Sequence, residues 1–266
     1  MALWCSAPRA CRGSSVTFAA LALIGLLGLV SGLMIGCIGI GGVILVPALV
    51  FLAGIPIKIS IPAAMAAYIL SGFVATAVFA RNKSIHWSMA LWLCAGATPT
   101  AFAGAWAVSV VNPRLLEVTL GLLTFGSGVN SLRTHKIAED GHTVSSITLL
   151  AVGAIVGFLS SVSGTGGPLV LVPILISMML PVLVSVGLSQ AIQLPIAIAA
   201  TVGNVIYGEF DWTLAGVLAV ALTAGSWYGA KLAHSLPRAT LRKIVSIVLV
   251  IVGTFILGSV GWHFTH

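Results

Sequence analysis

The hydrophobic pattern of the chain consists of long apolar runs, and charged residues are confined to the gaps between them. No Asp, Glu, Lys or Arg occurs between Arg12 and Lys58, from Ser84 to Pro113, or from Gly141 to Gly208. Division of these runs at Gly, Pro and polar clusters predicts ten helices, over 16–36, 42–53, 60–80, 87–108, 115–132, 146–163, 168–180, 186–206, 212–233 and 240–260. Eight of them approach the roughly 20 residues that a membrane span needs.

Two of the predicted helices, 42–53 and 168–180, are too short to span a membrane. At 1.5 Å per residue each covers about 20 Å or less, whereas the hydrocarbon core is about 30 Å thick. Each follows a Gly-rich break and contains a proline, Pro47 or Pro173. The pattern indicates a helix that is broken inside the membrane.

The two short helices belong to an internal repeat. The segment G-I-G-G-V-I-L-V-P at 39–47 matches T-G-G-P-L-V-L-V-P at 165–173, an offset of 126 residues. Further along, His86-Trp87 matches Asp211-Trp212 with an offset of 125. We therefore predict an all-α polytopic membrane protein with two homologous halves of about five helical elements each. Inverted repeats are the arrangement that we favour.

The repeat defines the predicted organisation of the chain. It consists of a polar N-terminal stub 1–15, a first repeat 16–132, a polar linker 133–145, a second repeat 146–260 and a tail 261–266. If both short helices cross the membrane, the 12 Lys and Arg residues divide four against eight between its two sides, which favours both termini outside. If the short helices re-enter, the division is six against six and favours neither orientation.

Composition agrees with a membrane protein. Hydrophobic residues make up 59% of the 266 residues and charged residues 6%, whereas a soluble domain has about 45–50% and about 25%. This excludes a soluble enzyme and a nucleic-acid partner, and predicts a multi-pass protein of the plasma (inner) membrane surrounded by the lipid bilayer. The four cysteines form no ligand pattern, so we expect no metal and no cofactor. The oligomeric state stays open, a homo-oligomer included.

The Gly-rich breaks are the candidate anion site. A helix that begins inside the membrane leaves backbone N–H groups unpaired at its positive end, and glycine lets a ligand approach them. Two such ends that face each other would bind an anion without a buried Lys or Arg. The candidate backbone contacts are Gly39, Gly41, Gly42, Gly164, Gly166 and Gly167. The alternative interpretation is close packing of helices at small residues.

Four polar side chains extend this candidate site. Ser163 and Thr165 flank the second glycine motif and would donate hydrogen bonds to an oxyanion, unless each bonds its own helix backbone. Gln190 and Gln193 share one helix face and must find either a polar cavity or a neighbouring helix, of which we favour the cavity. For Asn204, near the end of its span, we expect headgroup contact or a helix cap.

The motifs resemble the TauE/SafE sulfite exporter family, the anion permeases also called the TSUP family. The resemblance covers about residues 20–260 and rests on the two glycine motifs and on 81–87 (R-N-K-S-I-H-W), 207–212 (Y-G-E-F-D-W) and 236–242 (L-P-R-A-T-L-R). Family members often carry a Gly-Thr-Ser-like stretch after the broken helix, whereas this chain has Ile61-Pro62-Ala63 there in the first half. The resemblance implies transport of small sulfur-containing or organic anions, such as sulfite or sulfonates.

We therefore expect a secondary transporter, not an enzyme, that exports such an anion by alternating access. An anion that leaves a negative-inside cell gains about 2.3 kcal/mol per charge per 100 mV, so export needs no coupling ion. Uptake of the same anion would need a coupling ion, and the spans offer no evident proton relay to supply one. An uptake permease, a passive channel for small organic anions and an accessory subunit remain alternatives. A membrane-embedded enzyme would need a His/Cys/Asp constellation that the sequence does not offer.

Overall fold

The computed structural model describes residues 18–38, 42–81, 85–132, 144–178, 180 and 182–233, together with 254 and 258. Within these ranges every regular element is a helix, so the predicted all-α fold is confirmed. The predicted helix 240–260, most of the linker and both terminal segments lie outside the described residues, apart from isolated positions in that helix.

The described helices follow the predicted ones, with bounds that differ by at most four residues. They are α1 Phe18–Ile38, α2 Gly42–Phe51, α3 Ile57–Arg81, α4 Trp87–Val110, α5 Pro113–Leu132, α6 Ser146–Ser163, α7 Pro168–Ser177, α8 Val182–Tyr207 and α9 Trp212–Ala233. The agreement arises because Gly, Pro and charged residues end the apolar runs at the same places where the helices end.

The long helices have the length and surface of membrane spans. Among the described residues, α3, α4, α6 and α8 are each long and apolar enough to cross a bilayer. Their outward faces carry large apolar side chains: Phe73 is 63% exposed and Leu91 is 67% exposed. Such a surface is suited to lipid rather than to water. By contrast, α2 and α7 have ten residues each, about 15 Å, which is too short to cross a bilayer.

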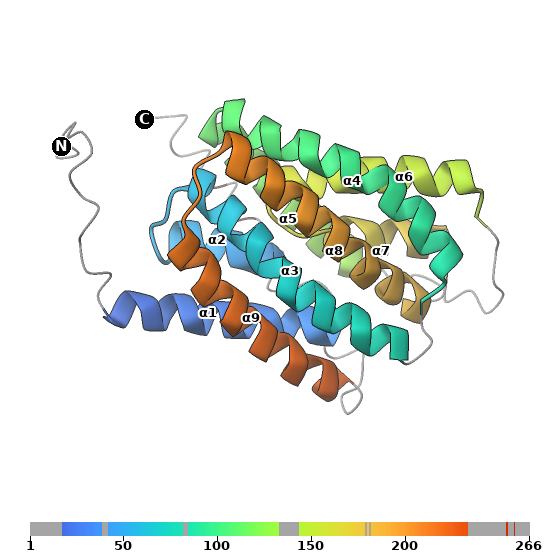
Figure 1. Ribbon diagram of the computed structural model, residues 1–266, viewed down its shortest axis with the longest axis horizontal. Helices are drawn as coiled ribbons and strands as arrows, with labels where there is room; N and C mark the ends of the chain where they lie inside the picture. The colour runs from blue at the N-terminus through green and yellow to red at the C-terminus, as the bar shows by residue number, and fades with distance from the viewer. Residues whose placement is uncertain are drawn as a thin grey trace.

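The long helices form two edge pairs with a central pair between them. Helix α1 packs along α9 at one edge, α4 packs along α6 at the opposite edge, and α3 and α8 lie between (Figure 1). Glycines allow the two helices of each edge pair to approach closely. A methyl group added at Gly153 of α6 would overlap the Leu93 carbonyl oxygen of α4, and one added at Gly229 of α9 would overlap the Leu33 carbonyl of α1.

The two edge pairs use matching positions. Gly32 of α1 faces the Leu222 carbonyl of α9, and Gly157 of α6 faces the Ala97 carbonyl of α4. The two glycines, Gly32 and Gly157, are therefore 125 residues apart in the sequence, and so are the two partner residues, Ala97 and Leu222. The same shift relates Gly104 and the Phe158 carbonyl to Gly229 and the Leu33 carbonyl. Two homologous halves would make contacts of this kind, although the internal repeat itself stays a prediction.

The short helices bring their first turns together inside the bundle. Val43 of α2 and Leu169 of α7 are fully buried in one apolar cluster, against which Met34 of α1 and Leu123 of α5 also pack. Since each residue lies in the first two positions of its helix, this contact joins the N-terminal turns of α2 and α7.

Candidate functional site

The second glycine motif is a tight, buried turn between α6 and α7. Gly164 ends α6 with φ of 70°, and Gly166 and Gly167 follow with φ of 78° and 113°. L side chains rarely adopt such values, so the turn requires glycine. Pro168 then begins α7 at the first helical position, where its missing N–H costs no hydrogen bond. The chain thus leaves one helix and starts another within four residues.

The first glycine motif meets the second one directly. Gly42, the first residue of α2, is buried, and a methyl group added there would overlap the Thr165 carbonyl oxygen and lie 3.2 Å from its carbon. Gly39 and Gly41 fall outside the described residues. For Gly42, Thr165 and their neighbours, the structure therefore brings together two motifs that are more than 120 residues apart.

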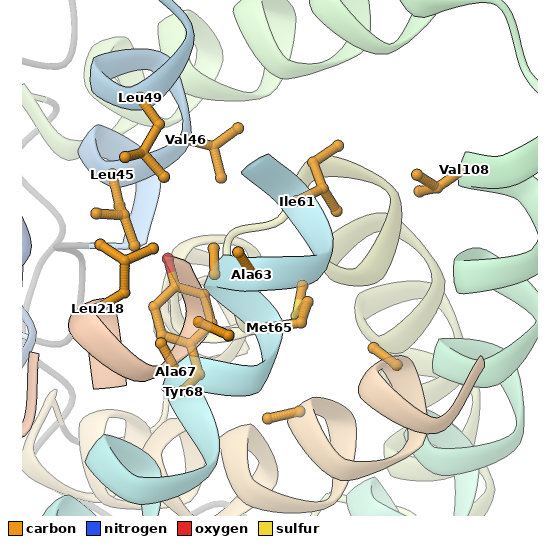
Figure 2. Packing of buried hydrophobic residues seen from close by; sticks show 14 of the residues in the cluster. Leu45, Val46, Leu49, Ile61, Ala63, Met65, Ala67, Tyr68, Val108 and Leu218 are labelled. Carbon is orange, nitrogen blue, oxygen red and sulfur yellow. The ribbon is translucent and has the colours of Figure 1, made fainter. Parts of the chain in front are cut away.

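Tyr68 of α3 links the two motifs and was missed by the sequence reasoning. Its hydroxyl donates a hydrogen bond to the Gly42 carbonyl at 3.1 Å, and its ring would lie 3.0 Å from a methyl group at Gly166. Figure 2 shows the ring standing out from α3 in the same apolar cluster as Leu45 and Leu218. One signal was available: a tyrosine in the middle of a span must find a partner for its hydroxyl.

The hydroxyls of Ser163 and Thr165 are used within the motif. Ser163 Oγ donates to the Leu159 carbonyl at 2.7 Å and lies 2.9 Å from Thr165 Oγ1. Because the Ser163 proton is taken by its own helix, Thr165 is the donor in the second bond. Both hydroxyl protons are therefore committed in this arrangement, and they reach an anion only after one of the hydroxyls rotates.

Gln190 and Gln193 lie in the bundle interior without full hydrogen bonding. Both are at most 1% exposed, and neither amide atom of Gln190 nor Oε1 of Gln193 has a partner. Gln193 packs against Gly72, one helical turn from Tyr68 on α3. Gly167 itself faces Ile192 and Ile196. The stretch of α8 that carries the glutamines therefore also contacts the second motif, through Ile192 and Ile196, while Gln193 packs against α3.

The expectation for Asn204 was wrong. The residue is fully buried, its side-chain amide has no partner, and it neither reaches headgroups nor caps a helix. Its backbone carbonyl accepts a hydrogen bond from the Gly208 N–H at 2.8 Å. The position near the end of the span suggested exposure, but the packing of α8 against its neighbours covers this residue.

Among the described residues, the charged side chains whose contacts are resolved lie at the helix ends. Lys58 donates to the Ser109 carbonyl at 3.0 Å, at the start of α3, and Asp211 caps α9 through the Thr213 and Leu214 N–H groups. Glu209 and Asp211 line a hollow of ≈ 530 Å³ at the turn before α9. Since carboxylates repel anions, this hollow is a poor anion site. The described residues contain no cluster of three or more His, Cys, Asp or Glu side chains suited to a metal ion.

The geometry at the motifs suits a small anion. Helices α2 and α7 both begin at the motifs, so the positive ends of both helix dipoles lie there. In the first turn of α7, Pro168 has no N–H and the Val170 N–H already donates to the Gly167 carbonyl at 3.3 Å. Glycine at the contact lets Tyr68 approach the backbone, since a methyl group at Gly42 would lie 3.0 Å from the Tyr68 hydroxyl and one at Gly166 would lie 3.0 Å from its ring.

Comparison with known proteins adds to this geometry. The sequence profile described as "Sulfite exporter TauE/SafE" matches residues 24–256. The "Probable membrane transporter protein YunE" of Bacillus subtilis (strain 168) is 26% identical over 259 residues, which cover 85% of this chain and 93% of the relative. The "Probable membrane transporter protein MJ0441" of Methanocaldococcus jannaschii is 24% identical over 255 residues, which cover 89% and 95%. No solved structure gives a significant match.

Proposed function

Because the chain belongs to the sulfite exporter TauE/SafE family, we propose that it exports sulfite or a related small sulfonate across the plasma (inner) membrane by alternating access. The observation that carries the proposal is the contact between the first residue of α2, Gly42, and Thr165 in the turn before α7. Two broken helices that meet inside a bundle are the usual binding arrangement of secondary transporters.

The anion binds where these helix ends meet. The backbone around Gly39, Gly41 and Gly42 on one side, and around Gly166 and Gly167 on the other, supplies the N–H donors, whereas the Gly164 N–H already donates to the Ser160 carbonyl. Each helix end carries roughly half a positive charge, so two ends offset much of the cost of burying one negative charge. Tyr68, Ser163, Thr165, Gln190 and Gln193 complete the polar surroundings.

The matched edge pairs support alternating access by two related halves. The contacts of α1 with α9 and of α4 with α6 follow one register, offset by 125 residues. In inverted-repeat transporters, one repeat rocks against the other around a fixed binding site. The central helices α3 and α8 then carry the movement, because they contact both the edge pairs and the short helices.

A flux assay with oriented driving forces tests the proposal. The purified protein is placed in liposomes loaded with sulfite, sulfate, methanesulfonate or acetate, and efflux is measured with and without a potential that is negative inside. We expect saturable efflux of sulfite or methanesulfonate, accelerated by the potential. Flux equal to that of protein-free liposomes for every anion would overturn the proposal, and non-saturable flux without counterflow would favour a channel.

Gly167→Ala connects the flux to the site. At φ of 113° the substituted residue is strained and its methyl group lies 3.2 Å from Ile196, so we expect efflux to be lost. Gly54→Ala is the matched control, because Gly54 also has a positive φ, 68°, but nothing within 4 Å. Equal efflux in the two variants would argue against an anion site at the second motif.

A further inference from the structure

Helix α8 carries a buried polar stripe that continues well beyond the glycine motifs. It consists of Gln190, Gln193, Thr201 and Asn204, each of which has at least one side-chain N or O atom that is buried without a hydrogen-bond partner. At 100° per residue the four positions fall within an arc of about 80° on the helix. Over 14 residues the stripe is about 21 Å long, most of the thickness of a hydrocarbon core of about 30 Å.

Contacts place the first half of the stripe against α3. The Gln190 carbonyl accepts a hydrogen bond from Thr76 Oγ1 at 2.9 Å, and Gln193 packs against Gly72. On the adjacent face of α8, Ile198, Val202 and Val205 are each more than 40% exposed. The polar stripe therefore points into the bundle, and the apolar face points towards the membrane.

The far end of the stripe is expensive to keep if it has no ligand. Asn204 is 0% exposed and both of its amide atoms lack partners, and Thr201 Oγ1 lacks one as well. Burial of an amide without hydrogen bonds opposes folding, whereas a leucine of similar volume would not. Polar groups inside a membrane bundle are costly, and those that face its interior are candidates for the route of a polar solute.

We propose that Thr201 and Asn204 form a second binding position for the transported anion, between the glycine motifs and the C-terminal end of α8. The inference rests on the proposed transport function. The Asn204 amide and the Thr201 hydroxyl are neutral donors, which suit an oxyanion that must bind and then leave again. Asn204 lies eleven residues beyond Gln193, about 16 Å along the helix, so an anion there occupies a position distinct from the motif site.

Paired measurements of stability and transport on Asn204→Leu test the proposal. We expect an unchanged or higher melting temperature, because an unpaired amide is removed, together with a fall of about tenfold in the ratio of maximal sulfite efflux rate to KM. Thr201→Val, which is nearly isosteric, is expected to change both quantities in the same directions by less. Asn204→Gln keeps the amide and should retain part of the transport.

Ser226→Ala is the matched control. Ser226 of α9 is also buried, but its hydroxyl already donates to the Thr223 carbonyl at 3.0 Å, so transport should be unaffected. Unchanged transport in both Asn204→Leu and Thr201→Val would overturn the second position, as would a lower melting temperature that accounts for the lost flux. If the wild type moves no anion, the proposed function itself fails. If Gly167→Ala loses efflux and Asn204→Leu keeps it, only the second position fails.

Discussion

At the scale of single residues, the candidate site depends on contacts between residues far apart in the chain. Gly42, Tyr68 and Thr165 come from α2, α3 and the turn before α7, and each contacts at least one of the others. A change in one of them therefore affects both glycine motifs. Two substitutions separate the contributions of the hydroxyl and of the close backbone contact.

Tyr68→Phe removes only the hydrogen bond to the Gly42 carbonyl. We expect a loss of about 1 kcal/mol in the free energy of unfolding and a lower transport rate, because α2 is no longer tied to α3 at its first turn. Unfolding in detergent and efflux from liposomes measure the two effects. Tyr228→Phe is the control, since Tyr228 is exposed on α9. Equal behaviour of the two variants would contradict the role of Tyr68.

Gly42→Ala tests the backbone contact. The added methyl group overlaps the Thr165 carbonyl, so α2 must move away from the second motif, at a cost of about 1–3 kcal/mol. We expect efflux to be lost and the melting temperature to fall. The same substitution at Gly216, which has nothing within 4 Å, should be silent. A fully active Gly42→Ala would mean that transport tolerates separation of the two motifs.

The residues that sequence reasoning missed were those whose role depends on packing. The duplicated glycines were visible because only glycine fits a sharp turn or a close backbone approach, and the motif occurs twice. Tyr68 belongs to no motif, and its significance appears only when α3 is placed beside both breaks. Asn204 seemed interfacial from its position in the span, but burial depends on neighbouring helices that one helix pattern does not reveal.

At the scale of helices, the positions of the elements could be predicted and their partners could not. Apolar runs and their Gly, Pro and charged boundaries are local features, so the sequence defines α3 or α8 to within a few residues. The pairing of α1 with α9 joins segments nearly 200 residues apart, and it rests on glycines at 32 and 229 whose facing carbonyls have no sequence signature. Spacing of small residues suggests that a helix packs closely, but does not identify its partner.

The Thr76 hydroxyl of α3 makes a hydrogen bond between the two central helices. It donates to the Gln190 carbonyl, so Thr76→Val should weaken the contact of α3 with α8 by about 0.6 kcal/mol, a typical value for a hydrogen bond between membrane helices. Thr119→Val is the comparison, because Thr119 bonds the Leu115 carbonyl of its own helix. Denaturant titrations of both variants give the difference in their free energies of unfolding. If the two free energies are equal, the Thr76 bond does not stabilise the contact of α3 with α8.

At the scale of the whole molecule, the matched edge pairs predict matched responses. A leucine at Gly32 or at Gly157 would separate an edge pair at the same register, since each glycine faces a carbonyl oxygen of the partner helix. We expect both variants to lose stability by similar amounts, and Gly25→Leu to lose far less because Gly25 has open space. Melting temperatures measure this. A large difference between Gly32→Leu and Gly157→Leu would speak against two equivalent halves.

The pairing of α1 with α9 also sets the order in which the molecule is completed during synthesis. When α6 is synthesised, its partner α4 is already present. The partner of α1, however, is complete only when α9 has been synthesised, 195 residues after α1 ends (233 − 38). At about 5–20 residues per second this takes on the order of 10–40 s. During that time the glycine face of α1 is open to other membrane helices. A nascent chain that stalls before α9 would therefore present an unpaired helix to the quality-control machinery of the cell.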